Sequence, residues 1–152
     1  EPISVKEQKT EATIENLNLL LAEDNELNAE IAEMLLSDEG AKITVVKNGL
    51  QAVKAFQENP CNYFDAILMD IMMPVMDGLA ATEAIRAAAR EDAKTIPIIA
   101  MTANAFQEDQ EQCYKAGMNA HLAKPLNMEK VIRTIYEQCR YKLSGRQQNK
   151  KT

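Results

Sequence analysis

Short apolar runs alternate with segments of helical periodicity five times along this chain, and this alternation is the feature that most constrains its fold. The apolar runs are Leu17–Ala22, Ile43–Val46, Phe64–Met69, Ile96–Met101 and Asn119–Ala123. Strands that are apolar along their whole length are typical of a parallel sheet covered by helices on both faces. The alternation therefore predicts an α/β domain with a doubly wound, five-stranded parallel sheet and five helices.

The segments between the runs carry apolar residues at helical spacing. Leu27, Ile31, Met34 and Leu35 fall at i, i+4, i+7 and i+8, which predicts an amphipathic first helix that ends near Gly40. Four more helices are predicted from Leu50 to Phe56, after Gly78, from Phe106 to Ala116 and from Met128 to Cys139.

The two ends of the chain lack such a pattern. Residues 1–15 are polar and aperiodic, so we expect a linker or a disordered tail before a domain that spans residues 16–140. Residues 141–152 are basic and polar, and we expect a second disordered tail there. Because the chain begins at Glu1 and not at a methionine, we expect it to be a piece of a longer protein.

Charge and cysteine content exclude several classes of function. The net charge is −6 although residues 140–152 contain five basic and no acidic side chains, so the body of the chain is acidic and we expect no nucleic-acid partner. No apolar run approaches the roughly 18 residues of a membrane span, so we expect no membrane insertion. The three cysteines form no C-x-x-C motif. They predict buried free thiols in a reducing cytosol, and neither a zinc site nor a disulfide framework.

Polar side chains follow four of the five predicted strands. Glu23 and Asp24 follow the first strand, Asp70 the third, Thr102 the fourth and Lys124 the fifth. Each has an ordinary explanation alone, such as a helix cap or an exposed loop lysine. However, ligands bind beyond the carboxyl ends of the strands in open parallel sheets, where these residues would meet.

Electrostatics indicates what such a site needs. Two carboxylates ~4 Å apart repel each other by roughly 4 kcal/mol at an effective dielectric constant of ~20, and one lysine cannot neutralise three acids. A hard divalent cation can, and an open site of oxygen ligands suits Mg²⁺, with Mn²⁺ as an alternative. One carboxylate oxygen would then be free to attack a phosphoryl group, whose oxygens an ammonium and a hydroxyl would hold.

Four motifs in order resemble the receiver domain of two-component response regulators: LLAED at 20–24, ILMDIMMPVMDG at 67–78, IIAMTANA at 98–105 and HLAKP at 121–125. The resemblance extends from Leu17 to Cys139. It implies a flavodoxin-like fold with strand order 2-1-3-4-5, which periodicity alone does not give.

The resemblance also implies roles for the acidic residues. Asp70 matches the phosphoacceptor. Asp24 and Asp70 match direct Mg²⁺ ligands, with the backbone carbonyl of Met72 as the third protein ligand. Glu23 matches the acid that reaches the metal through water.

Further residues match the family's phosphoryl-binding and switch positions. Thr102 and Lys124 match the hydroxyl and the amine that bind the phosphoryl group, and the peptide bond from Lys124 to Pro125 is expected to be cis. His121 matches a switch position whose side chain turns inward when Thr102 moves towards the phosphoryl group. Met72 and Asn104 match positions that tune the lifetime of the phosphoryl group.

The amino-acid sequences of the motifs are similar to those of receiver domains fused to hybrid sensor histidine kinases. Since His121 is the only histidine, the phosphoryl donor must be a histidine kinase, a histidine phosphotransfer domain or a small molecule. The expected location is cytoplasmic, with a parent protein that a membrane segment elsewhere can anchor. A homodimer is compatible with the sequence.

Three other readings stay open. A stand-alone response regulator would contain the same motifs. An interaction module that is never phosphorylated would keep the fold but not need the site. A Mg²⁺-dependent phosphatase would also form an aspartyl-phosphate, but it generally needs a second acid two residues after the nucleophile, where this chain has Met72. As a receiver, the domain would catalyse only its own phosphorylation and dephosphorylation.

Overall fold

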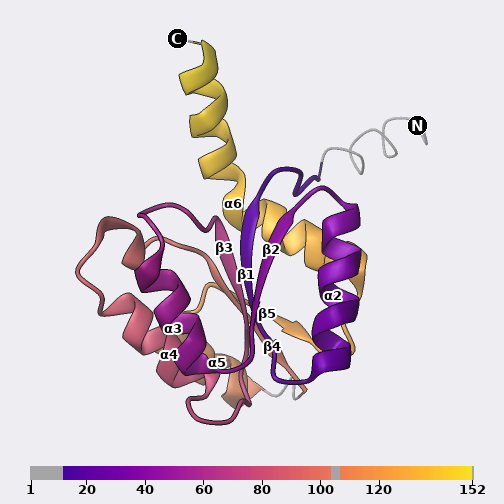
Figure 1. Cartoon of the computed structure of the whole chain (residues 1–152), viewed down its shortest axis with the longest axis vertical. Coiled ribbons are helices and arrows are strands. Elements are labelled where there is room, and N and C mark those ends of the chain that lie inside the picture. Colours follow the sequence, from indigo (N-terminus) through magenta and orange to yellow (C-terminus); the bar gives the residue numbers. More distant parts are fainter. Residues whose placement is uncertain (1–11, 104–106, 152) are drawn as a thin grey trace.

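One parallel sheet organises the computed structural model, which describes residues 12–103 and 107–151 (Figure 1). The strand order is β2-β1-β3-β4-β5, which confirms the fold that the resemblance implied. The strands are β1 (Asn18–Ala22), β2 (Lys42–Val46), β3 (Ala66–Asp70), β4 (Ile98–Thr102) and β5 (Ala120–Ala123). The helices are α2 (Glu26–Asp38), α3 (Gly49–Glu58), α4 (Gly78–Arg86), α5 (Gln107–Ala116) and α6 (Met128–Lys151), with a short 3-10 helix η1 (Glu91–Ala93) between α4 and β4.

The helices cover both faces of the sheet. In Figure 1, α2 and α6 lie on one side of the sheet, and α3, α4 and α5 lie on the other. Alternate strand residues point to opposite faces. Leu19 and Leu21 therefore belong to the core beside α2 and α6, whereas Leu20 packs in the second core with Phe56 of α3 and Ile85 of α4.

The register of the strands brings their carboxyl ends to one edge. Ala22 of β1 pairs with Met69 of β3, and Asp70 pairs with Met101 of β4. Thr102 then pairs with Ala123 of β5. The residues that follow or end these strands therefore meet at the same edge, as expected from the sequence.

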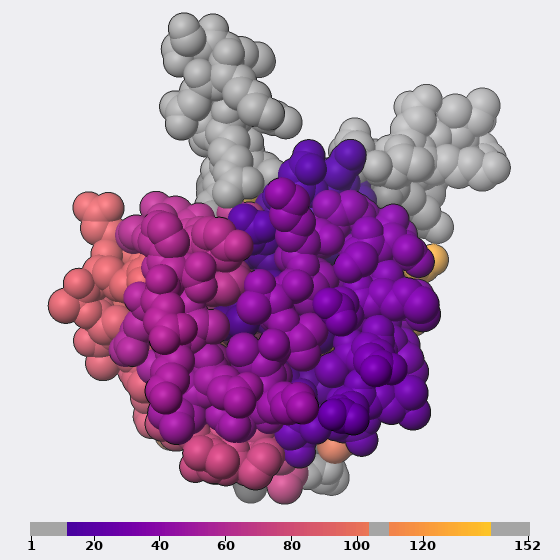
Figure 2. All heavy atoms as spheres, viewed as in Figure 1, coloured from indigo at the N-terminus to yellow at the C-terminus, as the bar shows by residue number. Residues whose placement is uncertain are grey.

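The apolar stripe that predicted the first helix points away from the core. Leu27, Ile31 and Met34 are 65%, 44% and 58% exposed, respectively. The buried face of α2 consists of Ala29, Ala32 and Leu36. Alanines allow the helix to pack closely against the sheet, but they are only weakly hydrophobic. The pattern of larger apolar side chains therefore predicted the wrong face of α2 as the buried one. Helix α2 forms part of the molecular surface seen in Figure 2, coloured indigo.

Part of the predicted N-terminal tail belongs to the domain. Ile14 is fully buried, the N–H of Leu17 donates to its carbonyl, and the N–H of Asn16 donates to the carbonyl of Gly40. A single apolar residue in a polar segment produces no periodicity, so this anchor was missed. Residues 1–11 of the predicted tail lie outside the described residues.

The last helix is longer than predicted. The α-helical backbone of α6 continues to Lys151, whereas residues 141–152 were expected to form a disordered tail. Seven of these twelve residues are Lys, Gln, Leu or Arg, which all have high intrinsic helix propensity. The segment has no apolar period, so periodicity alone does not indicate this helix. No helix among the described residues is long and apolar enough to span a membrane.

The three cysteines are free thiols, as predicted, but they are not all buried. Cys113 and Cys139 are buried in the core, whereas Cys61 is exposed. Cys61 follows Pro60 in the loop after α3.

Candidate functional site

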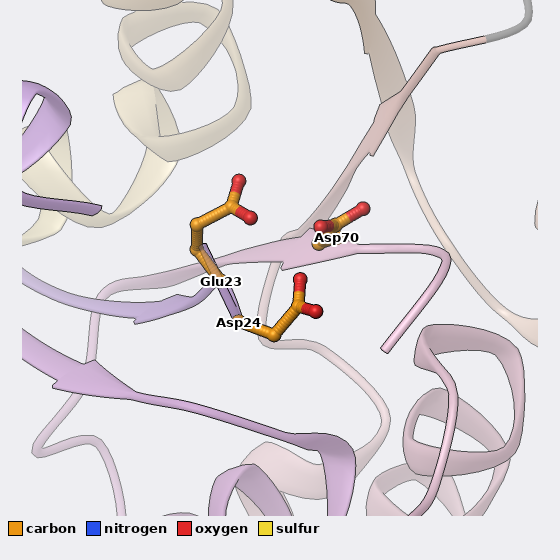
Figure 3. A group of neighbouring side chains, drawn as sticks. All are labelled: Glu23, Asp24 and Asp70. Atoms are coloured by element: carbon orange, nitrogen blue, oxygen red, sulfur yellow. The ribbon is translucent and has the colours of Figure 1, made fainter. Parts of the chain in front are cut away.

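Three carboxylates meet at the carboxyl edge of the sheet. Glu23 and Asp24 follow β1 directly, and Asp70 is the last residue of β3. One oxygen from each carboxylate lies within 4.8 Å of the others. Figure 3 shows the three side chains converging on a common space from the ends of these two neighbouring strands. Glu23 and Asp70 are buried and Asp24 is exposed, so the cluster is open to solvent on one side.

Lys124 supplies positive charge to the cluster. Its Nζ donates to Glu23 Oε1 and to Asp70 Oδ2, each at 3.0 Å. Lys124 follows β5, and its peptide bond to Pro125 is cis, as expected. One ammonium thus faces three carboxylates, so the cluster has an excess of negative charge.

The pKa values reflect this imbalance. Burial raises the pKa of Asp70 to about 6, with the negative charge of Glu23 adding to the effect and the hydrogen bond from Lys124 opposing it. Burial of Lys124 favours its neutral form, but the hydrogen bonds to Glu23 and Asp70 outweigh burial and raise its pKa. Asp70 is therefore a carboxylate at neutral pH whose charge the protein alone does not fully compensate.

A backbone contact holds Glu23 in place. Asn25 is the N-cap of α2, and its side-chain oxygen accepts from the N–H of Asn28 at 2.9 Å. The N–H of Asn25 donates to Glu23 Oε2 at 3.2 Å. The start of α2 therefore fixes Glu23 with a carboxylate oxygen turned towards Lys124.

The loop after β3 fits closely around Asp70. The N–H of Met72 donates to Asp70 Oδ1 at 3.3 Å, and the N–H of Gly78 donates to the carbonyl of Ile71 at 2.8 Å. A Cβ atom at Gly78 would collide with the carbonyl oxygen of Asp70, so only glycine allows this approach. Asp77 then caps α4 by accepting from the N–H of Ala80 at 2.8 Å. The sequence MDG thus turns the chain back beside the acid.

The other predicted site residues have different positions. Thr102 is buried at the end of β4, and its carbonyl accepts from the N–H of Lys124 at 2.8 Å. Met72 is 74% exposed at the rim of the cluster. His121 is half-buried in β5, where its Nδ1 lies 3.2 Å from the hydroxyl of Tyr114. Asn104 lies outside the described residues.

Two features of the site were missed from the sequence. Tyr114 approaches His121 from α5, and no motif or period links the two residues. A groove of about 530 Å³ also runs from the cluster along α2. Glu23 and Lys124 line one end, and Ile31, Leu35 and Leu126 are among its apolar walls.

The donor set is chemically uniform. All the side chains that converge in the cluster offer carboxylate oxygens, without the thiolate or imidazole ligands that favour zinc or copper. Oxygen ligands with an open side suit a hard divalent cation that keeps some of its waters.

Comparison with known proteins identifies the family. The sequence profile described as "Response regulator receiver domain" matches residues 19–136. The chain is also 40% identical, over 126 residues, to hybrid signal transduction histidine kinase I of Dictyostelium discoideum, in an alignment that covers 81% of this chain and 7% of that protein. The chain belongs to the receiver domain family of two-component systems. It spans between 7% and 16% of the length of the curated relatives that it matches.

Solved structures agree with this assignment. A receiver domain of a Pseudomonas aeruginosa sensor histidine kinase, with a magnesium ion coordinated in its active-site cleft, is 42% identical with a TM-score of 0.73, and the match covers 82% of this chain and 98% of that one. The receiver domain of the Saccharomyces cerevisiae response regulator Ssk1, in a complex with the histidine phosphotransfer protein Ypd1, is 28% identical with a TM-score of 0.73. That match covers 82% of this chain and 90% of the Ssk1 chain.

Proposed function

We propose that this receiver domain takes a phosphoryl group onto Asp70, with Mg²⁺, as part of a cytoplasmic phosphorelay in a hybrid sensor histidine kinase. The observation that carries the proposal is the cluster itself: three carboxylates lie together, one ammonium contacts only two of them, and Asp70 has a raised pKa. The relatives that are histidine kinases support the parent context.

Asp24, Asp70 and the backbone carbonyl of Met72 would hold the cation, with Glu23 reaching it through water. Mn²⁺ has the same preference for oxygen ligands and would bind in place of Mg²⁺. The Mg²⁺-bound relative with 42% identity supports this choice. When bound, the cation would neutralise the excess carboxylate charge and stabilise the charge on the phosphoryl oxygens.

The chain's own residues then supply the chemistry. A carboxylate oxygen of Asp70 attacks the phosphorus of a phosphohistidine or of a small acyl phosphate. The new P–O bond forms as the P–N or P–O bond to the donor breaks, and the leaving group takes the electron pair. Lys124, which already donates to Asp70 at 3.0 Å, would hold one phosphoryl oxygen, and the hydroxyl of Thr102 would hold another. Neutral pH lies above the pKa of Asp70, which is about 6, so the nucleophilic carboxylate is ionised.

The acyl phosphate would change the preferred conformations of side chains on β4 and β5. Phosphorylation adds negative charge and strong acceptor oxygens at Asp70. Thr102 would move towards them, and His121 would turn into the space that this movement opens. Met72 and Asn104 match the family's positions that tune the lifetime of the phosphoryl group, and they would set how fast water removes it.

A protein donor must approach along the rim of the cluster, because the phosphorus has to reach Asp70 directly. The exposed side chains of Leu27 and Ile31 lie on α2, next to the groove that opens at Glu23 and Lys124. This apolar strip is our candidate surface for a histidine kinase or a histidine phosphotransfer domain.

We expect Ile31→Glu to slow phosphoryl transfer from a phosphorylated histidine kinase but not from acetyl phosphate. Equal rates with the protein donor would rule this surface out.

Two alternatives predict different chemistry. A phosphatase would need an acid near the position of Met72, whose exposed thioether offers neither an acid nor a base. A passive interaction module would not need the charge imbalance that the cluster has. A stand-alone response regulator would share the chemistry proposed here and differ only in its parent protein.

The test is to incubate the protein with Mg²⁺ and acetyl phosphate and to measure the intact mass over time. We expect one phosphoryl adduct that decays slowly, and none with Asp70→Asn. Asp77→Asn is the matched control, since it lies on the same loop outside the cluster and asparagine also caps helices. Rapid turnover of assorted phosphoesters would favour the phosphatase. The absence of any adduct would favour the passive module.

A further inference from the structure

We propose that Tyr114 is a latch for His121, a positioning residue that holds the imidazole on the α5 side of β5 until Asp70 is phosphorylated. Breaking this contact would be part of the cost of activation and would release α5 from β5. The inference rests on the proposed function, because it concerns how the phosphorylated site is coupled to the surface of the domain.

The contact joins two separate elements. The hydroxyl of Tyr114 on α5 lies 3.2 Å from Nδ1 of His121 on β5. The two rings also meet edge to face, with centroids 6.2 Å apart and an interplanar angle of 82°. A tyrosine hydroxyl can donate or accept a hydrogen bond, so either tautomer of His121 satisfies this contact.

The sheet register connects His121 to the site. His121 pairs with Ala100 of β4, and Thr102 lies two residues further along the same strand. Residues i and i+2 of a strand share one face, and Ala100 belongs to the core on the α3, α4 and α5 side. His121 and Thr102 therefore lie on the same face of adjacent strands, with only the methyl group of Ala100 paired beside the imidazole.

Helix α5 buries few side chains in the part of it whose side chains the structure describes. Among its side chains whose burial the structure describes, from Gln110 to Ala116, only Cys113 and Ala116 are buried. Tyr114 itself is 49% exposed, so the core does not fix its ring. The contact with His121 therefore ties the partly exposed ring of Tyr114 on α5 to β5.

The carboxyl end of α5 is fixed separately. Arg86 of α4 donates from Nε to the carbonyl of Gly117 at 2.9 Å and from Nη2 to Asn119 Oδ1 at 2.7 Å. Its Nη1 donates to the carbonyl of Ala93 at 3.0 Å. Release of Tyr114 would therefore let α5 move about a fixed end.

A single histidine makes the latch measurable. His121 is the only histidine in the chain, so its imidazole CH signals in an NMR spectrum need no further assignment. The probe is beryllium fluoride with Mg²⁺, which mimics a phosphoryl group on a carboxylate. The test variant is Tyr114→Phe, which keeps the ring and removes only the hydroxyl. The matched control is Tyr63→Phe, an exposed tyrosine that packs on Phe64 away from β5.

We expect Tyr114→Phe to shift the His121 signals in the free protein but not in the beryllium fluoride complex, where the contact is already broken. The half-saturating concentration of beryllium fluoride should fall about two- to fivefold, the effect of one partly exposed hydrogen bond that no longer opposes activation. Tyr63→Phe should change neither quantity.

The outcomes separate the latch from the proposed function. If beryllium fluoride binds the wild type but Tyr114→Phe behaves like Tyr63→Phe, the latch is wrong and the proposed function stands. If the Tyr114→Phe shift of the His121 signals is the same in both states, the contact survives activation, and the latch is again wrong. If beryllium fluoride and Mg²⁺ do not bind the wild type, the proposed function fails and the latch fails with it.

Discussion

Asp70 and Asp92 are both buried aspartates, 5% and 2% exposed, yet their surroundings move their pKa values in opposite directions. Asp92 accepts from Arg90 Nε at 2.6 Å and from Arg90 Nη2 at 3.0 Å, and it also accepts from the N–H of Asn62 at 2.8 Å. Burial alone would raise the pKa of Asp92, but these hydrogen bonds outweigh it and hold the pKa at about 2. Asp70 shares one ammonium with Glu23, and its pKa rises to about 6.

The two arrangements serve different ends. Arg90 also donates from Nη1 to the carbonyls of Phe56 and Asn59, and its guanidinium lies 4.3 Å from the centroid of the Phe56 ring. Asp92 is therefore part of a matched network that ties the loop before β4 to α3. The cluster around Asp70 is unmatched, and a carboxylate that the fold does not satisfy is available to a cation and to chemistry.

The largest effect is expected at the matched acid. Asp92→Asn should lower the free energy of unfolding by about 2–4 kcal/mol at pH 7, because it leaves a largely buried arginine without its charged partner. Denaturant unfolding measures the change, with Asp38→Asn as a control at an exposed acid. A loss no larger than that of the control would mean that Asp92 is not a structural acid.

Replacing the unmatched acid, Asp70, should have the opposite effect on the free energy of unfolding. The pKa of folded Asp70, about 6, lies above its ordinary value of 3.8, so the folded state holds the proton more tightly than the unfolded state. Stability without metal therefore falls as the pH rises through the window from 3.8 to about 6, and the full cost is present above it.

Asp70→Asn should remove that cost and raise the free energy of unfolding of the metal-free protein by about 1–3 kcal/mol at pH 8. At pH 4 the gain should be mostly gone, since wild-type Asp70 is then protonated. Unfolding curves at both pH values, recorded with a chelator present, measure the difference. Destabilisation at pH 8 would contradict the charge imbalance.

The next prediction concerns competition between protons and metal. Below pH 6 the apparent Mg²⁺ affinity of the wild type should fall about tenfold per pH unit, as one proton must leave Asp70 for each cation bound. Above pH 7 it should be nearly constant. Calorimetric titration across this range gives both slopes. Asp24→Asn should weaken binding at every pH but leave the break near pH 6, and a break that vanished in this variant would place the titrating group elsewhere.

The smallest effect is expected at the shared cation. Lys124→Met should lower the stability of the metal-free protein by about 1 kcal/mol at pH 8, since it removes a partly exposed ammonium from two acids. Saturating Mg²⁺ should erase most of this deficit, because the cation replaces the lost positive charge. The free energy of unfolding with and without Mg²⁺ tests this. A deficit that Mg²⁺ leaves unchanged would mean that Lys124 acts mainly through packing.

The position of the acids was predictable because it follows from topology. Parallel strands end at one edge of a sheet, so that edge was predictable once the strands were recognised. The approach of Glu23, Asp70 and Lys124 also depends on the strand order β2-β1-β3-β4-β5, which the resemblance implied and periodicity did not. The contact of Tyr114 with His121 depends on how α5 sits on the sheet, which residue spacing does not encode. The same holds for Ile14, a single anchor in a polar segment.

The face of α2 shows another limit of pattern reading. Two sides of α2 carry apolar residues at helical spacing. One side has Leu27 and Ile31, and the other has Ala29 and Ala32. Hydrophobicity favours the first pair for burial, but close packing on the sheet favours the second. Only the structure distinguishes an apolar stripe that faces the core from one that faces solvent.

The central claim is that one unmatched cluster binds a divalent cation and presents Asp70 to a phosphoryl group. A crystal structure with Mn²⁺ and beryllium fluoride tests it most directly, since anomalous scattering locates the cation. We predict a manganese ion bound to Asp24, Asp70 and the carbonyl of Met72, with beryllium bonded to Asp70 and its fluorides held by Thr102 and Lys124. A cation bound elsewhere, or beryllium bonded to another carboxylate, would contradict the account.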